Sequence, residues 1–547
     1  MKIYNKLILI SLAQLCLIMS ANGQDSGPLN IGYFDPGNFT ATTLDFSRAY
    51  MGGSARMQGL GGAQTALGGD ISSASSNPAG LGFFNRSEFS FSPTINFLNS
   101  FSDYLGNNST DSRVNFNFAN LGVVFNKTKG DLAEGKWRGG SFGVSLNRIA
   151  DFHRQVSYSG LSYNDFMRDN NGNIVVDEND NPILELDANS PRDIIEYAVL
   201  NSSADAAGNL SFNSDLAELA YEAYLIDAFE IDDVMQPDRD IYAVDENGNL
   251  LNDDYIPAYP ELGLETEQME TIKSTGGIYQ TSLSYGGNYN DRFYFGAGLG
   301  ILSVSRDIER TYTERPTQTT LRELNLTDKY STNGVGVNAT LGLIVRPINT
   351  VLLGAQYTSP SLYSLQQTQE TTLSASYLRS TDYRSNYEEY GFVYDAFNYN
   401  MVTPSKLSGG ITYFFGKSGF ITGDVERVNY SGGKVSQGDS YDFSVDNEEI
   451  NKFEKVLNFR VGAEFRLDIF RFRGGYSYFG DPVDNNIDES MSRVSAGAGV
   501  RTKDYFIDLG VATNLGFENT VSPYPGAGTA VVNNKNTAAT FSVGFFF

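Results

Sequence analysis

Residues 540–547, which end the chain, read T-F-S-V-G-F-F-F and decide the fold class. Alternate positions carry large apolar side chains: Phe541, Val543, Phe545 and Phe547. The intervening positions 540, 542 and 544 carry small or polar residues. This period of two is typical of a β-strand with one apolar and one polar face. Because a terminal aromatic strand of this kind closes bacterial outer-membrane barrels, we expect Phe547 to be recognised by the barrel-assembly machinery.

The opposite end of the chain predicts export. Residues 1–23 combine Lys2 and Lys6 with an apolar core and end on small residues, as a secretory signal peptide does. The only cysteine, Cys16, lies inside this segment, so the mature chain has no thiol for a disulfide or a metal. With His153 as the single histidine, we expect no metal site and no cofactor.

Fourteen segments after residue 85 alternate with period two. They span residues 86–98, 113–126, 136–150, 276–288, 293–310, 330–345, 350–363, 406–415, 419–431, 455–467, 469–480, 491–501, 504–514 and 537–547. In the second segment the alternation changes parity near Ala119, which predicts a β-bulge.

The connections between these segments alternate between short and long. No run of about 18 or more apolar residues follows the signal, so we expect no transmembrane helix. Outer-membrane barrels have an even strand number, short periplasmic turns and long external loops. A secreted or periplasmic β-sandwich has no reason to follow that rule. We therefore predict an all-β fold, a 14-stranded antiparallel transmembrane β-barrel over residues 86–547, in the cell outer membrane.

Most of the net charge of −26 falls in residues 151–275, which hold 28 acidic and 5 basic residues. We interpret this stretch as a hydrated extracellular insertion, and its charge argues against a nucleic-acid partner. Two Asn-Gly stretches, 168–173 and 245–249, are interpreted as turns, because each lacks the acidic twelfth ligand of an EF-hand.

Two helices are expected within the insertion. The first opens at Ser190 and Pro191, and the second spans residues 215–230. An apolar stripe follows the second helix: Leu216, Leu219, Ala220, Ala223 and Ile226. This stripe either packs against the external loops or lines a groove for an amphipathic ligand.

Residues 24–85 precede the first strand and are rich in Gly, Ala and Ser without strand alternation. Small residues of this kind suit a segment folded tightly inside another structure. The run Ser75-Ser76-Asn77-Pro78-Ala79-Gly80-Leu81 resembles the hatch signature of the FadL/TodX family of outer-membrane transporters for hydrophobic compounds. Residues 403–410 and 473–482 resemble two further strand motifs of that family. The resemblance covers roughly residues 50–150 and 276–547, and the acidic insertion departs from it.

The resemblance implies a 14-stranded barrel with an N-terminal hatch, residues 24–85, in its lumen. It implies capture of a hydrophobic ligand by the outer loops, binding inside the barrel, a shift of the hatch, and lateral release through a kink in the third strand. The hatch turn would be held by Asn77, Pro78, Ala79 and Gly80. Candidates for the kink are Gly139 and Gly140, since glycine within a strand marks bends.

We therefore predict passive transport of hydrophobic small molecules, either long-chain fatty acids or aromatic hydrocarbons, past the lipopolysaccharide and lipid of the outer membrane. The alternative is a FadL-like barrel that handles protein cargo in a secretion system. No enzyme is predicted: residues 139–143 match the G-x-S-x-G pattern of esterases, but they lie within an alternating strand rather than at a strand-to-helix turn. The residues that contact the ligand stay unassigned.

Overall fold

The computed structural model describes residues 38–48, 52–129, 135–163, 191–204, 209–230, 255–258, 265–317, 319–378, 387–436, 442–484 and 488–547. The predicted signal peptide and the two predicted turns in the insertion lie outside these residues. Within the described part of the chain, none of the helices is both long and apolar enough to cross a membrane.

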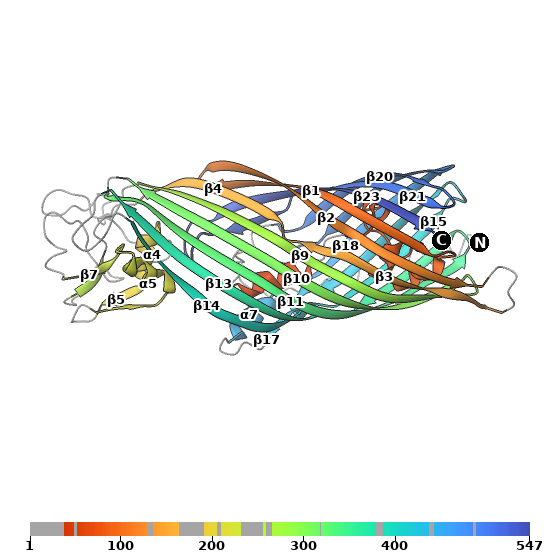
Figure 1. Ribbon diagram of the computed structural model, residues 1–547, viewed down its shortest axis with the longest axis horizontal. Coiled ribbons are helices and arrows are strands. Elements are labelled where there is room, and N and C mark those ends of the chain that lie inside the picture. Colours follow the sequence, from red (N-terminus) through yellow and green to blue (C-terminus); the bar gives the residue numbers. More distant parts are fainter. Residues whose placement is uncertain are drawn as a thin grey trace.

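A closed antiparallel barrel of 14 strands forms the body of the molecule (Figure 1). Several wall strands consist of two pieces. Around the wall, the order is β1 (Glu88–Tyr104), β2 (Asn107–Thr128), β3 (Trp137–Asp151) continued by β4 (Arg154–Tyr163), β9 (Glu265–Tyr289), β10 (Phe293–Pro316), β11 (Leu321–Ile348), β12 (Val351–Thr358) continued by β13 (Leu362–Tyr377), β14 (Tyr387–Val402) continued by β15 (Lys406–Phe414), β16 (Gly419–Asn429) continued by β17 (Lys434–Ser436), β18 (Lys455–Leu467), β19 (Phe470–Phe479), β20 (Met491–Arg501), β21 (Tyr505–Asn514) continued by β22 (Glu518–Val521), and β23 (Ala530–Phe546).

The last strand closes the barrel, as predicted. β23 pairs with β1, with Phe91 opposite Val543 and Thr94 opposite Thr540. The backbone of Phe547 exchanges two hydrogen bonds with Ser87, so the pairing extends to the last residue. Because the first and last strands are hydrogen-bonded to each other, the sheet has no open edge there. Lipid could not hydrogen-bond the backbone groups of such an edge.

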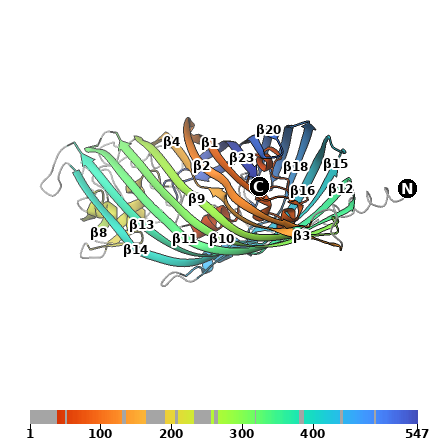
Figure 2. The ribbon, with the colours of Figure 1, turned by 45° about the vertical axis from the view of Figure 1, so that its right-hand side comes forward.

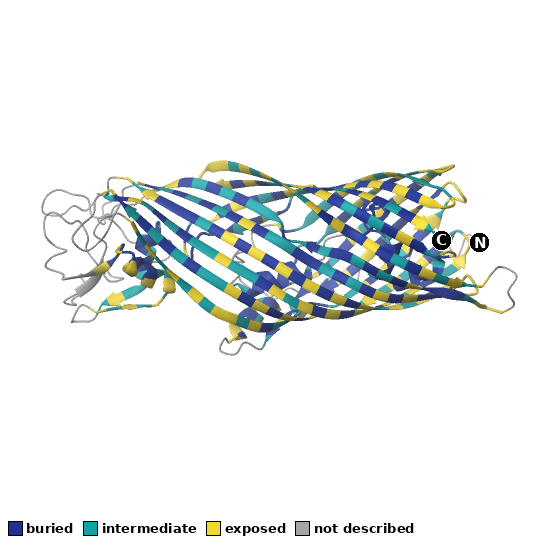
Figure 3. Ribbon diagram, in the orientation of Figure 1, coloured by how far each residue is buried: buried dark blue, intermediate teal, exposed yellow. Residues whose placement is uncertain are grey.

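Exposed and buried residues alternate along the wall strands (Figure 3), and on β23 the exposed face is apolar and the inner face is polar. On β23, Phe541 and Phe545 point outward and are 44% and 51% exposed, whereas Thr540 and Ser542 point inward and are fully buried. Leaving a large apolar side chain in water forgoes roughly 1.5–3 kcal/mol relative to burial. A band of many such side chains around the outside is therefore stable against hydrocarbon rather than water.

Each of the fourteen predicted segments overlaps one barrel strand, and the predicted bulge is confirmed. Ser92 pairs with Asn120 but Pro93 pairs with Phe118, so Ala119 is the extra residue. Several strands are longer than predicted: the predicted loop 364–405 contains most of β13 and all of β14 up to Val402, and β9 begins within the predicted insertion. The outer ends of these strands lie beyond the lipid-facing band, where outward positions are polar and the alternation that marks a strand is lost.

These long strands form an extension on one side of the barrel (Figure 2). The extension carries α4 (Ile194–Leu200), α5 (Asp215–Glu222) and two small two-stranded sheets, β5 (Ser202–Ala204) with β6 (Leu210–Phe212) and β7 (Asp227–Glu230) with β8 (Tyr255–Ala258). Leu219 and Ala220 of α5 are buried in one cluster with Leu373 of β13. The predicted apolar stripe therefore packs against the extension and does not line an open groove.

Both predicted helices in the insertion exist with different bounds. The first begins at Ile194 rather than at Pro191, because the Asp193 side chain caps it by accepting a hydrogen bond from the Glu196 amide. The second is capped by Ser214 and ends at Glu222. Tyr224 has a φ of 59°, a left-handed conformation that does not continue a helix.

Candidate functional site: the plugged lumen

Residues 52–84 fill the lumen at the end where the C-terminus lies. This segment, here called the plug, contains α3 (Ala55–Gly59), η1 (Ile71–Ala74) and η2 (Pro78–Phe83). Its backbone bonds to side chains of the wall: the Ala55 amide donates to Ser542, and the amides of Gln64 and Thr65 donate to Asp424 at 2.7 and 2.9 Å. Polar residues on the inner face of the barrel thus satisfy a segment that has little secondary structure of its own.

The wall meets the plug backbone at glycines. A Cβ atom on Gly296 of β10 would overlap the backbone of Pro78, and one on Gly475 of β19 would overlap Gly61. Only glycine allows two backbones to approach this closely. At these two positions the plug backbone therefore lies directly on the wall.

The predicted hatch residues lie together in the plug. Asn77 is fully buried and caps η2, because its Oδ1 accepts a hydrogen bond from the Ala79 amide at 3.1 Å. Its Nδ2 donates to the Thr65 carbonyl at 2.6 Å, which ties η2 to the preceding part of the plug. Pro78 occupies the first helical position, and Gly80 packs against Ser73.

A buried network of charges joins the plug to the wall. Arg473 of β19 lies 2.8 Å from Glu464 of β18 and 2.6 Å from Asp508 of β21. Arg56 of the plug lies 3.4 Å from the same Glu464 and 3.8 Å from Asp70. Removing one member of such a network leaves an uncompensated buried charge, at a cost of about 3–5 kcal/mol.

A second element crosses the lumen on the extension side of the plug. All nine residues of α2 (Phe39–Ser47) are buried. Asp45 pairs with Arg306 of β10 at 2.9 Å, and Phe46 stacks on Phe152 at a centroid distance of 5.4 Å. Phe39 packs edge-on against Tyr399 of β14. This helix is therefore held against β10 and β14 on the inner side of the wall.

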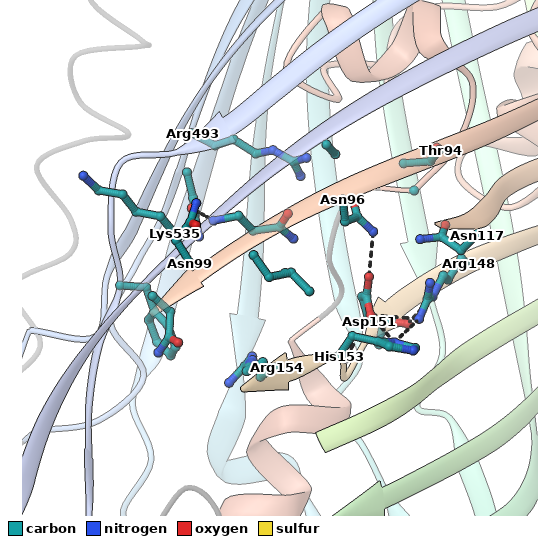
Figure 4. Close-up of a pocket in the computed structure, with 18 of the residues that line it drawn as sticks. Thr94, Asn96, Asn99, Asn117, Arg148, Asp151, His153, Arg154, Arg493 and Lys535 are labelled. Carbon is teal, nitrogen blue, oxygen red and sulfur yellow. Dashed lines mark hydrogen bonds and ion pairs between the residues drawn. The ribbon is translucent and has the colours of Figure 1, made fainter. Parts of the chain in front are cut away.

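A cavity of about 90 Å³, partly open to solvent, adjoins the plug (Figure 4). The residues that line it come from the plug, from the first wall strands of the chain and from the last ones. They include Gln58, Asn117, Arg148, Asp151, Arg493 and Phe517. Gln58 supplies part of the surface from α3, so the cavity ends at the plug.

The wall beside this cavity contains a seam. The ladder between β2 and β3 stops at the pair Asn120 and Asn147. β4 then pairs with β9, and within the described residues no ladder joins β4 to β2. Side chains of β2 bridge the seam instead: Asp111 accepts hydrogen bonds from the Ser157 amide and hydroxyl, and Arg113 donates to the Ser274 carbonyl at 3.1 Å.

The break between β3 and β4, at residues 152–153, lies at this seam. Arg148 and Asp151 of β3 both line the cavity and pair with each other at 2.8 Å. Asp151 also accepts a hydrogen bond from Asn96 of β1 at 2.7 Å. The register between β3 and β9 shifts between Arg148 and Ala150, so the strand is irregular where it borders the cavity.

The predicted kink residues lie at the other end of β3. Gly139 has a φ of 118° and occupies a second register shift, between Trp137 and Gly139. Gly140 pairs with Lys127 of β2, within the intact ladder. Their role as the kink stays a prediction. Ser141 of the esterase-like pattern is fully buried within β3 and accepts a hydrogen bond from Asn126, so it does not lie at a strand-to-helix turn.

Sequence reasoning did not identify the cavity residues Arg493 and Asn117. The available signal was an isolated arginine in the small-residue strand M-S-R-V-S-A-G, at residues 491–497. A charged residue among small residues on the inner face of a strand is unusual and could have drawn attention to Arg493. Which residues lie next to it depends on the neighbouring strands, which the sequence does not give.

No family model and no curated protein matches the chain. Solved structures similar to it include the P. putida toluene transporter TodX, at 13% identity and a TM-score of 0.47, covering 92% of this chain and 99% of that one. A Pseudomonas aeruginosa FadL homologue is similar at 10% identity and a TM-score of 0.48, covering 91% and 99%. The Ralstonia pickettii toluene transporter TbuX is similar at 12% identity and a TM-score of 0.43, covering 90% and 98%. At this distance no residue role is carried over from them.

Proposed function

We propose that this chain is an outer-membrane transporter that passively carries hydrophobic small molecules, long-chain fatty acids or aromatic hydrocarbons, as its resemblance to the FadL/TodX family implies. The observation that carries the proposal is a cavity that ends at the plug and borders a seam in the wall. Ligand enters from the outer loops, binds in the cavity and leaves sideways through the seam into the membrane.

The plug supports a sideways rather than an axial route. A straight path to the periplasm requires the plug to leave the glycine contacts at Gly296 and Gly475 and the charge network at Arg56. In the proposed hatch, Asn77, Pro78, Ala79 and Gly80 keep the turn next to the wall. A shift of the plug that opens the cavity would have to be small enough to preserve these contacts.

The seam supports lateral release on energetic grounds. A hydrogen bond contributes about 0.5–1.5 kcal/mol net, so the few side-chain bonds from Asp111 and Arg113 give way more easily than a continuous ladder. Outward-facing Val114 and Phe116 of β2 are 64% and 62% exposed, as we expect of side chains that contact lipid beside the seam. Each CH₂ moved from water into hydrocarbon gains about 0.8 kcal/mol. The ligand therefore needs no energy source if it is consumed downstream.

The proposal can be tested by placing a large side chain in the cavity from one wall strand. Ala538 of β23 faces the lumen, is 5% exposed and lines the cavity, while its neighbour Ala539 faces outward. We expect Ala538→Trp to abolish uptake of radiolabelled oleate and toluene by intact cells, and Ala539→Trp to leave both unchanged. Unchanged uptake of both compounds in the Ala538→Trp variant, present at native abundance, contradicts the proposal.

The extension favours a second candidate, a protein-handling component of a secretion system. β10 and β11 stay paired from Phe293 to Glu314, well past the outermost lipid-facing side chain of β10, Ile301. Such an extension presents a large ordered surface to other proteins. Mass spectrometry of the detergent-purified protein distinguishes the two: bound lipid or hydrocarbon supports transport, and stoichiometric recovery of a secreted protein supports cargo handling.

A further inference from the structure

The strand β14 forms one border of the extension (Figure 1, Figure 2). It pairs with β13 along its whole length, from Tyr387 to Val402. Among the described residues, its other edge pairs only with β17, at residues 400–402. The outer part of β14, residues 389–395, therefore has one edge that no described strand covers. We call residues 389–395 the open edge.

The pairing with β13 shows which backbone groups of the open edge point away from β13. The Thr403 amide donates to the Ser361 carbonyl, so every second residue of β13, counted from Ser361, bonds to β14. In the outer part of β14, the partners of those residues are Tyr390, Phe392 and Tyr394. The residues between and before them, which direct their N–H and C=O groups toward the uncovered side, are Glu389, Gly391 and Val393.

Packing on the inner face of the extension holds the open edge in place. Tyr390 and Phe392 pack against the buried cluster that contains Leu219 of α5. The Tyr394 hydroxyl donates a hydrogen bond to Asp215 at the start of the same helix. The open edge is thus already in strand conformation, so a strand that adds to it has to order only itself.

The open edge lies beyond the lipid-facing band. On β13, Leu362 is the last outward-facing large apolar side chain. Glu389 pairs with Ser374, which lies about 40 Å further along β13 than Leu362. The open edge also contains neither proline nor lysine, the residues that commonly protect an edge strand from pairing. Its backbone groups are therefore available to another strand outside the membrane.

Charge decides what kind of strand fits the open edge. Residues 387–402 contain three acidic residues and no basic one, and α5 behind them likewise contains three acidic residues and no basic one. Glu389 and Asp395 face outward on the same side as Val393, which is 81% exposed. Within the described part of the chain, neither carboxylate forms an ion pair. A strand laid on the open edge would place its own side chains directly opposite these three.

We propose that the open edge binds an extended basic segment of another protein, which adds to the sheet as a further antiparallel strand. Its backbone bonds to Glu389, Gly391 and Val393. Lysine or arginine side chains lie opposite Glu389 and Asp395, and an apolar side chain lies opposite Val393, so the segment alternates with period two. This inference goes beyond the proposed transport and does not depend on it.

Fluorescence anisotropy with the purified full-length protein in a non-ionic detergent tests the proposal. The probe is a labelled, end-capped peptide, Lys-Thr-Val-Thr-Val-Thr-Lys, whose Lys and Val side chains match the outward face of the open edge. We expect the same peptide with Glu in place of both Lys to bind about tenfold more weakly, because the two cross-strand charge pairs become repulsive.

Two N-methylated peptides test the backbone pairing. In antiparallel addition, the Val amides donate to the open edge and the Thr amides point to solvent. We therefore expect methylation of the two Val amides to abolish binding and methylation of two Thr amides to preserve it. The two peptides have equal charge and composition, so a purely electrostatic contact would not distinguish them.

Variants of the protein test the same two features. Val393→Pro removes an N–H from the open edge and leaves the β13 ladder intact, as proline does on an edge strand, so peptide binding should be lost. Glu389→Lys with Asp395→Lys should reverse the preference in favour of the Glu peptide. The matched control is Glu267→Lys with Glu309→Lys, which makes the same change in net charge at exposed positions of β9 and β10 and should keep the native preference.

Hydrogen exchange locates the bound peptide. We expect the amides of residues 389–393 to exchange slowly only when the peptide is present. No binding of the Lys peptide, equal binding of the two methylated peptides, or binding without protection of these residues overturns the proposal. Slow exchange without peptide also overturns it: protection at every protein concentration assigns the open edge to another segment of this chain, and protection that grows with concentration assigns it to a second copy.

Uptake separates this inference from the proposed function. Val393→Pro, present at native abundance, should take up labelled oleate and toluene as the native protein does, because the open edge lies far from the cavity and the seam. Loss of uptake in this variant would contradict the independence of the open edge from transport. Failure of every peptide to bind leaves the proposed transport standing.

Discussion

The contact between the plug and the wall differs from the seam in how polar groups are satisfied. Around Arg473 each buried charge has an opposite charge within 3.8 Å, and glycines bring the backbones into contact. Along the seam, side chains such as Asp111 replace the strand ladder, and Arg493 in the adjoining cavity has no carboxylate partner among the described residues. Buried polar groups are therefore paired where the plug must stay closed. They are less completely paired at the seam and cavity, where we propose that ligand binds and leaves.

The largest effect is expected at the charge network. Arg473→Leu leaves Glu464 and Asp508 buried with reduced compensation, so we expect a loss of about 3–5 kcal/mol in the free energy of unfolding. Urea unfolding in detergent, followed by tyrosine fluorescence, measures this loss. Arg471→Leu, two residues earlier on β19 and less buried, is the control and should change the free energy of unfolding by less than about 0.5 kcal/mol. Equal stability of the two variants contradicts the role assigned to the network.

A smaller effect is expected at the glycine contacts. Gly296→Ile places a side chain where Pro78 lies, so we expect overpacking to cost about 1–3 kcal/mol and to displace the plug. A displaced plug should raise the rate at which small sugars enter proteoliposomes. The control is Gly409→Ile, because a Cβ atom there meets no atom within 4 Å. If the Gly296→Ile variant admits sugars no faster than the native protein, the position of the plug does not depend on this contact.

The extension should respond to pH. Glu314 lies on β10 well beyond the lipid-facing band, and its carboxylate oxygens accept hydrogen bonds from the Ile194 amide at the start of α4. Burial, with the nearby Asp193 charge as a second cause, raises the pKa of Glu314 from 4.5 to about 8, and burial raises the pKa of Asp193 to about 6. Both carboxyls have a lower pKa when α4 is undocked, so docking of α4 is most stable below about pH 4 and weakens as the pH rises to about 8.

Hydrogen exchange of α4, corrected for intrinsic rates, measures this dependence. We expect protection of residues 194–200 to fall between pH 5 and pH 8. Glu314→Gln removes the carboxyl with the higher pKa and should flatten the profile above pH 6. An unchanged profile in that variant would assign the pH response to another group.

The smallest stability effect is expected at the seam. Asp111→Ala removes the acceptor for the Ser157 amide, so we expect a loss of about 1 kcal/mol in local stability. Hydrogen exchange of residues 154–163 should rise, while global unfolding shifts little. Uptake should not fall, since opening becomes easier. A fall in uptake at native abundance would argue that Asp111 contributes to ligand binding instead.

The lipid-facing part of the barrel was predictable because the bilayer forces apolar residues onto every second position, as on β23. β14 was missed because beyond the bilayer its outward positions, such as Glu389 and Asp395, are polar. The seam could not be predicted, because it is a missing ladder between the described residues of β2 and β4, and the sequence of each strand does not show with which neighbour it pairs. Within the described residues Arg493 has no carboxylate partner, because strand register places Ser477 and Asn514 across from it, and the sequence does not show that register.

The central claim, lateral release through the seam, is tested most directly by closing it. The mature chain is predicted to lack cysteine, so Asp111→Cys with Ser157→Cys offers one possible disulfide, across the seam. Asp103→Cys with Asn108→Cys joins two residues that are already paired in the β1–β2 ladder and is the control. We expect oxidation to stop uptake of labelled oleate only in the first pair, and reduction to restore it. Undiminished uptake through a fully oxidised seam would contradict lateral release.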